Sequence, residues 1–235
     1  MNLVAFAVLS GQEWSALRLS FQVALCAAMA GLPLAVVIGY LLARNPLPGK
    51  WLVEALVNLP LVLPPVVTGY LLLVLFSPRG PIGSVLQGLF GLKVVFHWTG
   101  AALAAMVVSF PLMVRAIRIA FQAVDPGLEM AARSLGAGPV TAFFTITLPL
   151  ARRGLVAGWL LAFARSLGEF GATIMVAGNI EGQTQTIPLA IFTLSSRPGG
   201  IEQSWRLVAL SLVLACGALA ISELMERRSA RRESA

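Results

Sequence analysis

The feature that most constrains this chain is a series of apolar stretches, each long enough to cross a lipid bilayer. The stretch from Leu19 to Ala43 contains no charged residue at all. A helix needs about 20 predominantly apolar residues to cross the hydrocarbon core of a membrane. Five stretches meet this requirement: 19–43, 51–76, 99–121, 154–176 and 205–224. The sequence therefore predicts an all-α polytopic transmembrane helical bundle that occupies residues 1–235 as a single domain.

Composition excludes an ordinary soluble enzyme. Only 11% of the residues are charged and 58% are hydrophobic, whereas soluble domains carry roughly 25% charged residues. The net charge of +7 would suggest nucleic acid in a soluble protein. In a membrane protein, however, a basic excess belongs to the cytoplasmic connections. We therefore expect a lipid bilayer around the chain and no nucleic-acid partner.

The distribution of Lys and Arg predicts the orientation in the cell (inner or plasma) membrane. If the N-terminus is outside, eleven of these residues fall on the cytoplasmic side and five on the outer side. Cytoplasmic connections are enriched in Lys and Arg, so a multi-pass chain with its N-terminus outside and its C-terminus in the cytoplasm is expected. The cytoplasmic set is Arg44, Lys50, Arg115, Arg118, Arg133, Arg152, Arg153, Arg227, Arg228, Arg231 and Arg232.

Three shorter apolar segments are too short to cross a membrane. Ser84–Phe96 and Ile187–Leu194 are flanked by Gly or Pro and are predicted to form short helices that lie at the outer face or dip partway into the bilayer. The first ten residues are apolar as well and would add a partial sixth segment.

The connection 122–153 is predicted to contain a short helix. Asp125 followed by proline is a typical helix start, with a side-chain acceptor at the cap. Glu129 and Arg133 lie four residues apart and are expected to pair on one helix face. Ala131-Ala132 would give a face with little side-chain bulk, and Gly136 a backbone suited to a helix stop. The simpler interpretation is a solvated turn between two spans.

The residues of this connection resemble the EAA loop of ATP-binding-cassette (ABC) importer permeases. The resemblance rests on Glu129-Met130-Ala131-Ala132, on Gly136 and on Ile146-Thr147-Leu148-Pro149. Met130 occupies the position where the motif has its acidic residue, and Glu129 stands one residue earlier. Which of the two side chains makes the contact of the acidic residue is therefore open.

The resemblance implies a type I ABC importer permease (MetI-like) fold and a set of partners. The short helix would dock in a cleft on a cytoplasmic ATPase, two copies of which would bind ATP and Mg²⁺. No cofactor is expected in this chain, which contains no G-x-x-x-x-G-K-[ST] run. A periplasmic or extracellular oxyanion-binding protein would deliver the substrate. The residues expected to contact the ATPase or to shape this loop are Asp125, Glu129, Met130, Ala131, Ala132, Arg133, Gly136, Leu148 and Pro149.

Three further segments look like the molybdate branch of these permeases: Leu59–Val67, Ser109–Leu112 and Phe163–Thr173. The function that this resemblance implies is import of an oxyanion, molybdate first, by alternating access. Sulfate or tungstate permeases of the same class are the alternative. An isolated charge is costly to bury in hydrocarbon, so a polar path along the two-fold axis of a homodimer is expected.

Residues near breaks in the spans are candidates for this path or for its gating. The candidates are Asn58, Pro64, Pro65, Thr68, Ser109, Arg165, Ser166, Gly168, Glu169 and Gly171. The proline cluster would give either a pore-lining kink or a packing kink. Arg165 would either meet the substrate or form an internal ion pair with Glu169. We favour the ion pair, because an uncompensated cation would trap a dianion that must be released.

Other functions find less support in the sequence. His97 is the only histidine, so a two-His haem site is excluded, and an interfacial histidine beside Trp98 is expected. No cysteine cluster offers metal ligands, and no metal site is predicted. A membrane anchor of an enzyme remains a remote alternative, and an ion-driven carrier is disfavoured by the scarcity of acidic residues within the spans.

Overall fold

The chain folds into helices only, as far as the structure describes it. This computed structural model describes the backbone of residues 10–44 and 48–233, with side chains up to Gly217 and at Ala220. Every regular element within these ranges is helical, which confirms the all-α prediction. The elements are α1 (Gly11–Arg44), α2 (Lys50–Val62), α3 (Pro65–Phe76), α4 (Pro81–Phe90), α5 (Trp98–Gln122), α6 (Pro126–Ser134), α7 (Pro139–Ala142), the π-helix η2 (Phe143–Thr147), α8 (Leu148–Leu167), α9 (Gly171–Ala177), α10 (Ile187–Ser195) and α11 (Gly200–Glu233).

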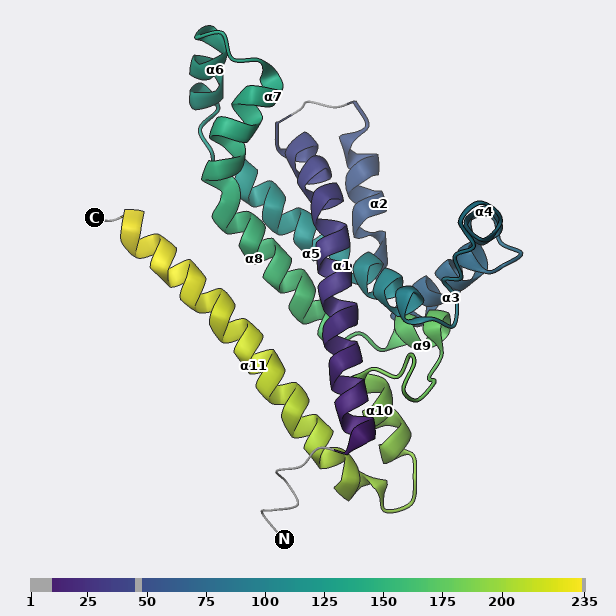
Figure 1. Ribbon diagram of the computed structural model, residues 1–235. Helices are drawn as coiled ribbons and strands as arrows, with labels where there is room; N and C mark the ends of the chain where they lie inside the picture. The colour runs from purple at the N-terminus through teal and green to yellow at the C-terminus, as the bar shows by residue number, and fades with distance from the viewer. Residues whose placement is uncertain (1–9, 45–47, 234–235) are drawn as a thin grey trace.

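Three long helices, α1, α5 and α8, pack together as the core of the molecule (Figure 1). The buried cluster between them includes Ile117 and Phe121 of α5, Ala35 of α1 and Ala162 of α8. The α2–α4 segment lies to one side of this core, and α11 runs obliquely along the other side (Figure 1).

Small residues explain how closely the three core helices approach one another. A Cβ atom added at Gly39 of α1 would lie 2.9 Å from Cγ2 of Ile117 on α5. One added at Gly158 of α8 would lie 3.2 Å from the Cβ of Ala116 on α5. In lipid, burial of apolar side chains does not drive helices together, so close backbone approach at small residues matters more than in water.

The second predicted span, 51–76, is not one continuous helix. Helices α2 and α3 meet at an angle of 112°, with Leu63 and Pro64 in extended backbone conformations between them. Pro64 and Pro65 have no N–H to donate, and a residue that precedes proline is disfavoured in the helical region. The prediction that these prolines interrupt the helix is confirmed, and the crossing of the membrane by the bent pair stays a prediction.

The helix that carries most of the fourth predicted span, 154–176, has different bounds from that span. The helical run begins at Pro139 and ends at Leu167, so α7 and η2 belong to it and the connection 122–153 is shorter than expected. At its other end, Gly168–Phe170 separate α8 from α9. The π-helix has a local cause: Pro149 cannot donate to the carbonyl of Thr145, and a widened turn accommodates its ring.

Three described helical runs are long and apolar enough to cross a membrane, namely α1, α5 and Pro139–Leu167, and the bent pair α2–α3 would make a fourth. The fifth predicted span, 205–224, lies on α11, whose side chains are described only up to Gly217 and at Ala220, so its crossing stays a prediction. The short helix predicted at Ile187–Leu194 occurs as α10, whereas the one predicted at Ser84–Phe96 occurs as α4, which begins three residues earlier and ends at Phe90. Residues 1–9 lie outside the described residues, and with them the possible sixth segment.

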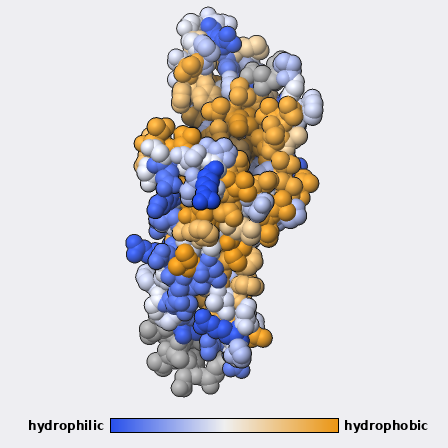
Figure 2. Space-filling model, turned by 90° about the vertical axis from the view of Figure 1, so that its right-hand side faces the viewer, coloured by the Kyte–Doolittle hydropathy of each residue, from blue (hydrophilic) through white to orange (hydrophobic). Residues whose placement is uncertain are grey.

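Much of the apolar surface lies on the α2–α4 side. Helix α2 buries none of its side chains, and Val62 is 81% exposed and Leu89 74% exposed. Figure 2 shows hydrophobic side chains over a broad part of the middle of this face, with hydrophilic side chains at the top and over the lower part. A contiguous apolar surface of this kind marks contact with lipid or with another protein.

Candidate functional site

The short helix predicted at 126–134 is present with the expected ends. Oδ1 of Asp125 accepts a hydrogen bond from the backbone N–H of Gly127 at 2.8 Å. Gly136 has a φ of +94°, and its N–H donates to the carbonyl of Arg133. Only glycine adopts such a φ without a steric penalty, so both ends of α6 are fixed by local sequence.

Helix α6 projects from one end of the bundle and leaves most of its surface uncovered (Figure 1). None of its nine residues is buried. Met130 is 63% exposed, and Leu135, just after the helix, is 89% exposed. Ala131 is exposed and Ala132 is half-buried, so the uncovered face combines small and apolar side chains and suits a close helix-in-groove contact.

Glu129 points back into the bundle. Its Oε1 accepts a hydrogen bond from the Tyr40 hydroxyl at 3.0 Å, and its Oε2 accepts one from the Thr147 hydroxyl at 3.1 Å. The carboxylate thus joins α6 to α1 and to η2. The expected Glu129–Arg133 pair is not among the ion pairs of the described residues, and the carboxylate is directed at these two hydroxyl groups instead.

The Tyr40 ring is itself held by aromatic packing. It meets Phe121 edge-on at 5.5 Å and Phe143 at 4.9 Å between ring centroids. A second tie lies nearby, where Nη2 of Arg44 donates to the carbonyl of Val124 at 2.7 Å. The end of α1 therefore holds both the start of the α6 segment and the middle of its helix.

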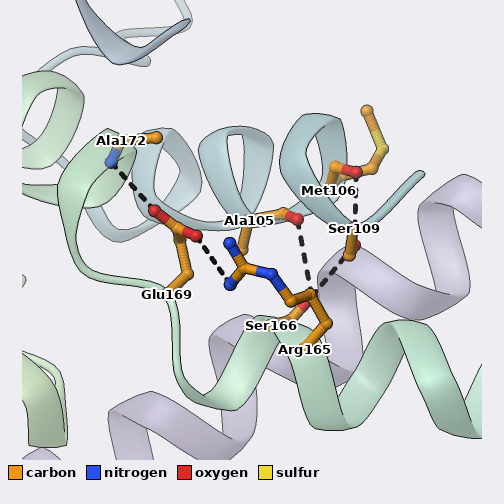
Figure 3. Close-up of polar contacts among 7 residues, drawn as sticks. All are labelled: Ala105, Met106, Ser109, Arg165, Ser166, Glu169 and Ala172. Atoms are coloured by element: carbon orange, nitrogen blue, oxygen red, sulfur yellow. Dashed lines mark hydrogen bonds and ion pairs between the residues drawn. The ribbon is translucent and has the colours of Figure 1, made fainter. Parts of the chain in front are cut away.

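Near the C-terminal end of α8, the predicted ion pair between Arg165 and Glu169 is confirmed. Nη1 of Arg165 lies 2.8 Å from Oε2 of Glu169 (Figure 3). The other oxygen of Glu169 accepts a hydrogen bond from the N–H of Ala172 at 2.9 Å, at the start of α9. The Arg165 side chain is 33% exposed and that of Glu169 is 2% exposed. The sequence did not predict that Glu169 also satisfies the first turn of α9.

Ser109 and Ser166 form a buried polar link between α5 and α8. The hydroxyl of Ser166 donates to that of Ser109 at 3.1 Å, and the hydroxyl of Ser109 donates to the carbonyl of Met106 (Figure 3). Both side chains are buried. Their hydrogen bonds are therefore made inside the chain in this conformation.

The break after α8 packs against the bend between α2 and α3. A Cβ atom added at Gly171 would lie 2.9 Å from the Cβ of Pro65, and one added at Gly69 would lie 2.7 Å from the carbonyl oxygen of Ala172. At Gly168, by contrast, nothing lies within 4 Å of an added Cβ atom.

Thr68 lies beside this contact. It is 4% exposed, and its hydroxyl has no hydrogen-bond partner among the described residues. A buried hydroxyl without a partner is uncommon and calls for a bound water, a ligand or another conformation.

A polar cavity lies between α1, α2 and α5, on the side of the bundle where α6 lies. Its volume is about 330 Å³. Nη1 of Arg118 and Oε1 of Glu54 form an ion pair at 2.8 Å, and the amide of Asn58 donates to the carbonyl of Glu54 at 2.7 Å. The lining residues are Leu42, Glu54, Val57, Asn58, Pro111, Val114, Arg115 and Arg118.

Of this lining, only Asn58 was predicted from the sequence as a site residue. The signal for the rest was present, because Glu54 and Arg115 are charged residues inside stretches predicted to cross the membrane. Charged residues at such positions usually face protein or water. What the sequence did not show is that α2 and α5 bring them to one cavity.

His97 caps α5. Its Nδ1 accepts from the N–H of Thr99 at 3.4 Å and lies 3.0 Å from the Thr99 hydroxyl. The imidazole ring lies 5.7 Å from that of Trp98, in keeping with an interfacial histidine. Within residues 10–44 and 48–233, no group of three His, Cys, Asp or Glu side chains is arranged to hold a metal ion.

Comparison with known proteins places this geometry in context. Residues 31–231 match the family described as "Binding-protein-dependent transport system inner membrane component". The "Molybdenum transport system permease protein ModB" of Escherichia coli (strain K12) is 52% identical over 225 residues, which cover 96% of this chain and 98% of that protein. The protein of the same name from Haemophilus influenzae is 50% identical over 216 residues, 92% of this chain and 94% of that one.

More distant matches support the same fold. The "Sulfate transport system permease protein CysT" of Salmonella typhimurium is 37% identical over 185 residues, 79% of this chain and 66% of that protein. Among solved structures, a bacterial ABC transporter for import of the acidic polysaccharide alginate matches with a TM-score of 0.70 and 17% identity, covering 95% of this chain and 80% of that one. At this identity the structural match speaks for the fold alone.

Proposed function

The chain belongs to the family of binding-protein-dependent transport system inner membrane components, and we propose that it is the membrane-spanning subunit of an ABC importer for molybdate. The observation that carries this proposal is the 52% identity to a molybdenum permease over nearly the full length of both chains. Identity to the sulfate permease is lower and covers less of the chain. Sulfate or tungstate therefore remains the second choice of substrate.

Helix α6 is the proposed contact with the ATPase. Its exposed face of Ala131, Met130 and Leu135 suits a groove on a partner, while Glu129 is engaged inside the chain. This arrangement favours Met130 over Glu129 as the side chain that meets the partner. Two ATPase subunits, one for each permease copy, would bind ATP and Mg²⁺. Their closure would pull α6 together with α1 and η2.

A homodimer is the proposed assembly. The core of α1, α5 and α8 is packed with apolar side chains, while the α2–α4 side exposes a broad apolar face. Two copies related by a two-fold axis would bury this face and leave a path between them. ATP binding would favour one orientation of the dimer and hydrolysis the other, as a shift between populations.

The proposed orientation puts the N-terminus outside and α6 in the cytoplasm, and an oxyanion-binding protein would dock on the outer side. The support is the excess of Lys and Arg on the α6 side. For the path itself we retain the prolines of the α2–α3 bend, Asn58 and Thr68. Gly168 and Gly171, at the break between α8 and α9, are retained as candidates for gating. The ion pair of Arg165 with Glu169 supports packing over substrate contact.

The test is transport in proteoliposomes that contain this chain, its ATPase and its binding protein. ATP-dependent uptake of molybdate is expected, and excess sulfate should compete less well than tungstate. Vesicles without nucleotide and vesicles without the ATPase are the controls. Uptake without ATP would contradict the importer class, and stronger competition by sulfate would contradict molybdate as the substrate. Failure of uptake with both partners present would leave the anchor of a membrane enzyme as the alternative.

A further inference from the structure

The cavity between α1, α2 and α5 carries a net positive charge. Arg115 and Arg118 contribute two positive charges and Glu54 one negative charge. Glu54 is paired with Arg118. Arg115 has no hydrogen-bond or ion-pair partner among the described residues and is exposed. One guanidinium therefore remains uncompensated at the edge of the cavity.

An uncompensated guanidinium within a membrane-spanning helix needs water or an anion. Arg115 lies two turns before α5 ends at Gln122, at the cytoplasmic end of the predicted span 99–121, where an arginine turns to water or an anion rather than to hydrocarbon. Its planar donors suit the oxygens of an oxyanion. Asn58 uses one amide hydrogen for the carbonyl of Glu54 and keeps a second one free to donate. Arg118 keeps donors beyond the one that meets Glu54.

Glu54 limits how tightly an anion can bind here. The side chain of Glu54 is 34% exposed, and its carboxylate faces the same cavity. The carboxylate therefore repels a dianion and uses one of the N–H donors of Arg118. A site built in this way attracts an oxyanion but does not retain it. The volume of about 330 Å³ also leaves room for hydration water, whose share of the liquid is about 30 Å³ per molecule.

We propose that this cavity is a weak binding site for a tetrahedral oxyanion, with Arg115 as its main ligand, Asn58 and Arg118 as further donors, and Glu54 as the residue that keeps affinity low. The proposal rests on the proposed function for the identity of the anion. The cavity lies on the α6 side, which in the proposed orientation is the side where the substrate leaves the transporter.

The experiment uses a single thiol as a reporter in the cavity. Val57 lines the cavity and is half-buried, so Val57→Cys places the thiol there and leaves the polar residues in place. The native cysteines, Cys26 and Cys216, are first replaced by alanine. The rate of modification by an anionic methanethiosulfonate is measured on the complex with its ATPase, with and without molybdate, and with chloride at equal ionic strength.

Two substitutions are expected to act in opposite directions. Molybdate should slow modification in the parent protein. Arg115→Gln should raise the molybdate concentration for half protection about tenfold or more, the factor given by a dianion and a unit charge about 5 Å apart at the dielectric constant of water. Glu54→Gln should lower that concentration by a comparable factor. Arg152→Gln, which removes an exposed charge of α8 outside the cavity, is the matched control and should change nothing.

Two outcomes would overturn the proposal. One is that molybdate, tungstate and sulfate at tens of millimolar all fail to protect the thiol. The other is that Glu54→Gln loses protection just as Arg115→Gln does, which would mean that the ion pair of Glu54 with Arg118 only shapes the cavity. If Arg115→Gln does not fold, Arg115→Lys keeps the charge and should retain protection. Uptake measured on the same preparations separates the two hypotheses: transport without protection refutes this site alone, and protection without transport refutes the proposed function.

Discussion

The attachment of α6 to the bundle through Glu129 allows a quantitative test. Tyr40→Phe removes the hydroxyl that donates to Glu129 at 3.0 Å and keeps the ring that packs on Phe121 and Phe143. A hydrogen bond to a charged group contributes about 1.5–3 kcal/mol. Because Glu129 is only half-buried, solvent screening reduces this to about 1–1.5 kcal/mol. The α6 segment should therefore detach about five to ten times more often.

Hydrogen exchange of the α6 amides measures this detachment. An isolated helix of nine residues is marginal in water, so the amides of α6 should exchange when the helix leaves the bundle. Tyr40→Phe should speed their exchange about five- to tenfold, and in the transporter it should lower uptake per ATP hydrolysed. Thr145→Val is the matched control, because the Thr145 hydroxyl bonds within its own segment to the carbonyl of Thr141 and does not contact Glu129.

A double-mutant cycle decides whether the effect runs through Glu129. If Tyr40 acts through this carboxylate, Tyr40→Phe should change little in a Glu129→Ala background, which has no acceptor for the Tyr40 hydroxyl, with a coupling energy of about 0.5–3 kcal/mol. Unchanged exchange in Tyr40→Phe, or fully additive effects of the two substitutions, would refute the reasoning.

Three further predictions concern glycine conformation, the ion pair and the helix break. Gly136→Ala should cost about 1–2 kcal/mol, because φ is +94°, and should reduce uptake at an unchanged amount of membrane-inserted protein; Gly138→Ala, with a φ of −66°, should not. Arg165→Ala should lower the yield of folded protein by leaving the buried Glu169 carboxylate without its cation. Adding Glu169→Gln, which removes the charge but keeps an acceptor for the N–H of Ala172, should restore yield and transport together; restored folding without transport would indicate a substrate role. Gly69→Ala should lower the melting temperature in detergent, because its Cβ would lie 2.7 Å from a backbone oxygen, whereas Gly88→Ala, with nothing within 4 Å, should have little effect.

Local sequence predicted the parts of the molecule that depend on local physics. The cap at Asp125, the stop at Gly136 and the interruption at Pro64 follow from backbone chemistry within a few residues, and all three are found. Hydropathy alone found the long helices α1 and α5, because crossing a bilayer requires a fixed apolar length. The sequence did not predict where the helix of the fourth predicted span ends. The largely apolar pattern continues through Gly168–Phe170, whereas the helical backbone is interrupted there.

What remained hidden depends on contacts between residues far apart in the chain. Glu129 was expected to pair with Arg133 four residues away, but the fold offers it Tyr40 of α1, 89 residues distant, and a hydroxyl on η2. Glu54 and Arg118, 64 residues apart in the chain, form an ion pair. Together with Arg115 they line a cavity that the spacing of residues in the sequence does not predict. The sequence by itself determined that the chain belongs in a lipid bilayer, that it is helical, and that a short helix lies between Asp125 and Gly136. Only the tertiary structure decided which charged groups form pairs. The reason is that an ion pair or hydrogen bond requires two groups to lie within a few ångströms, and the packing of the helices sets these distances.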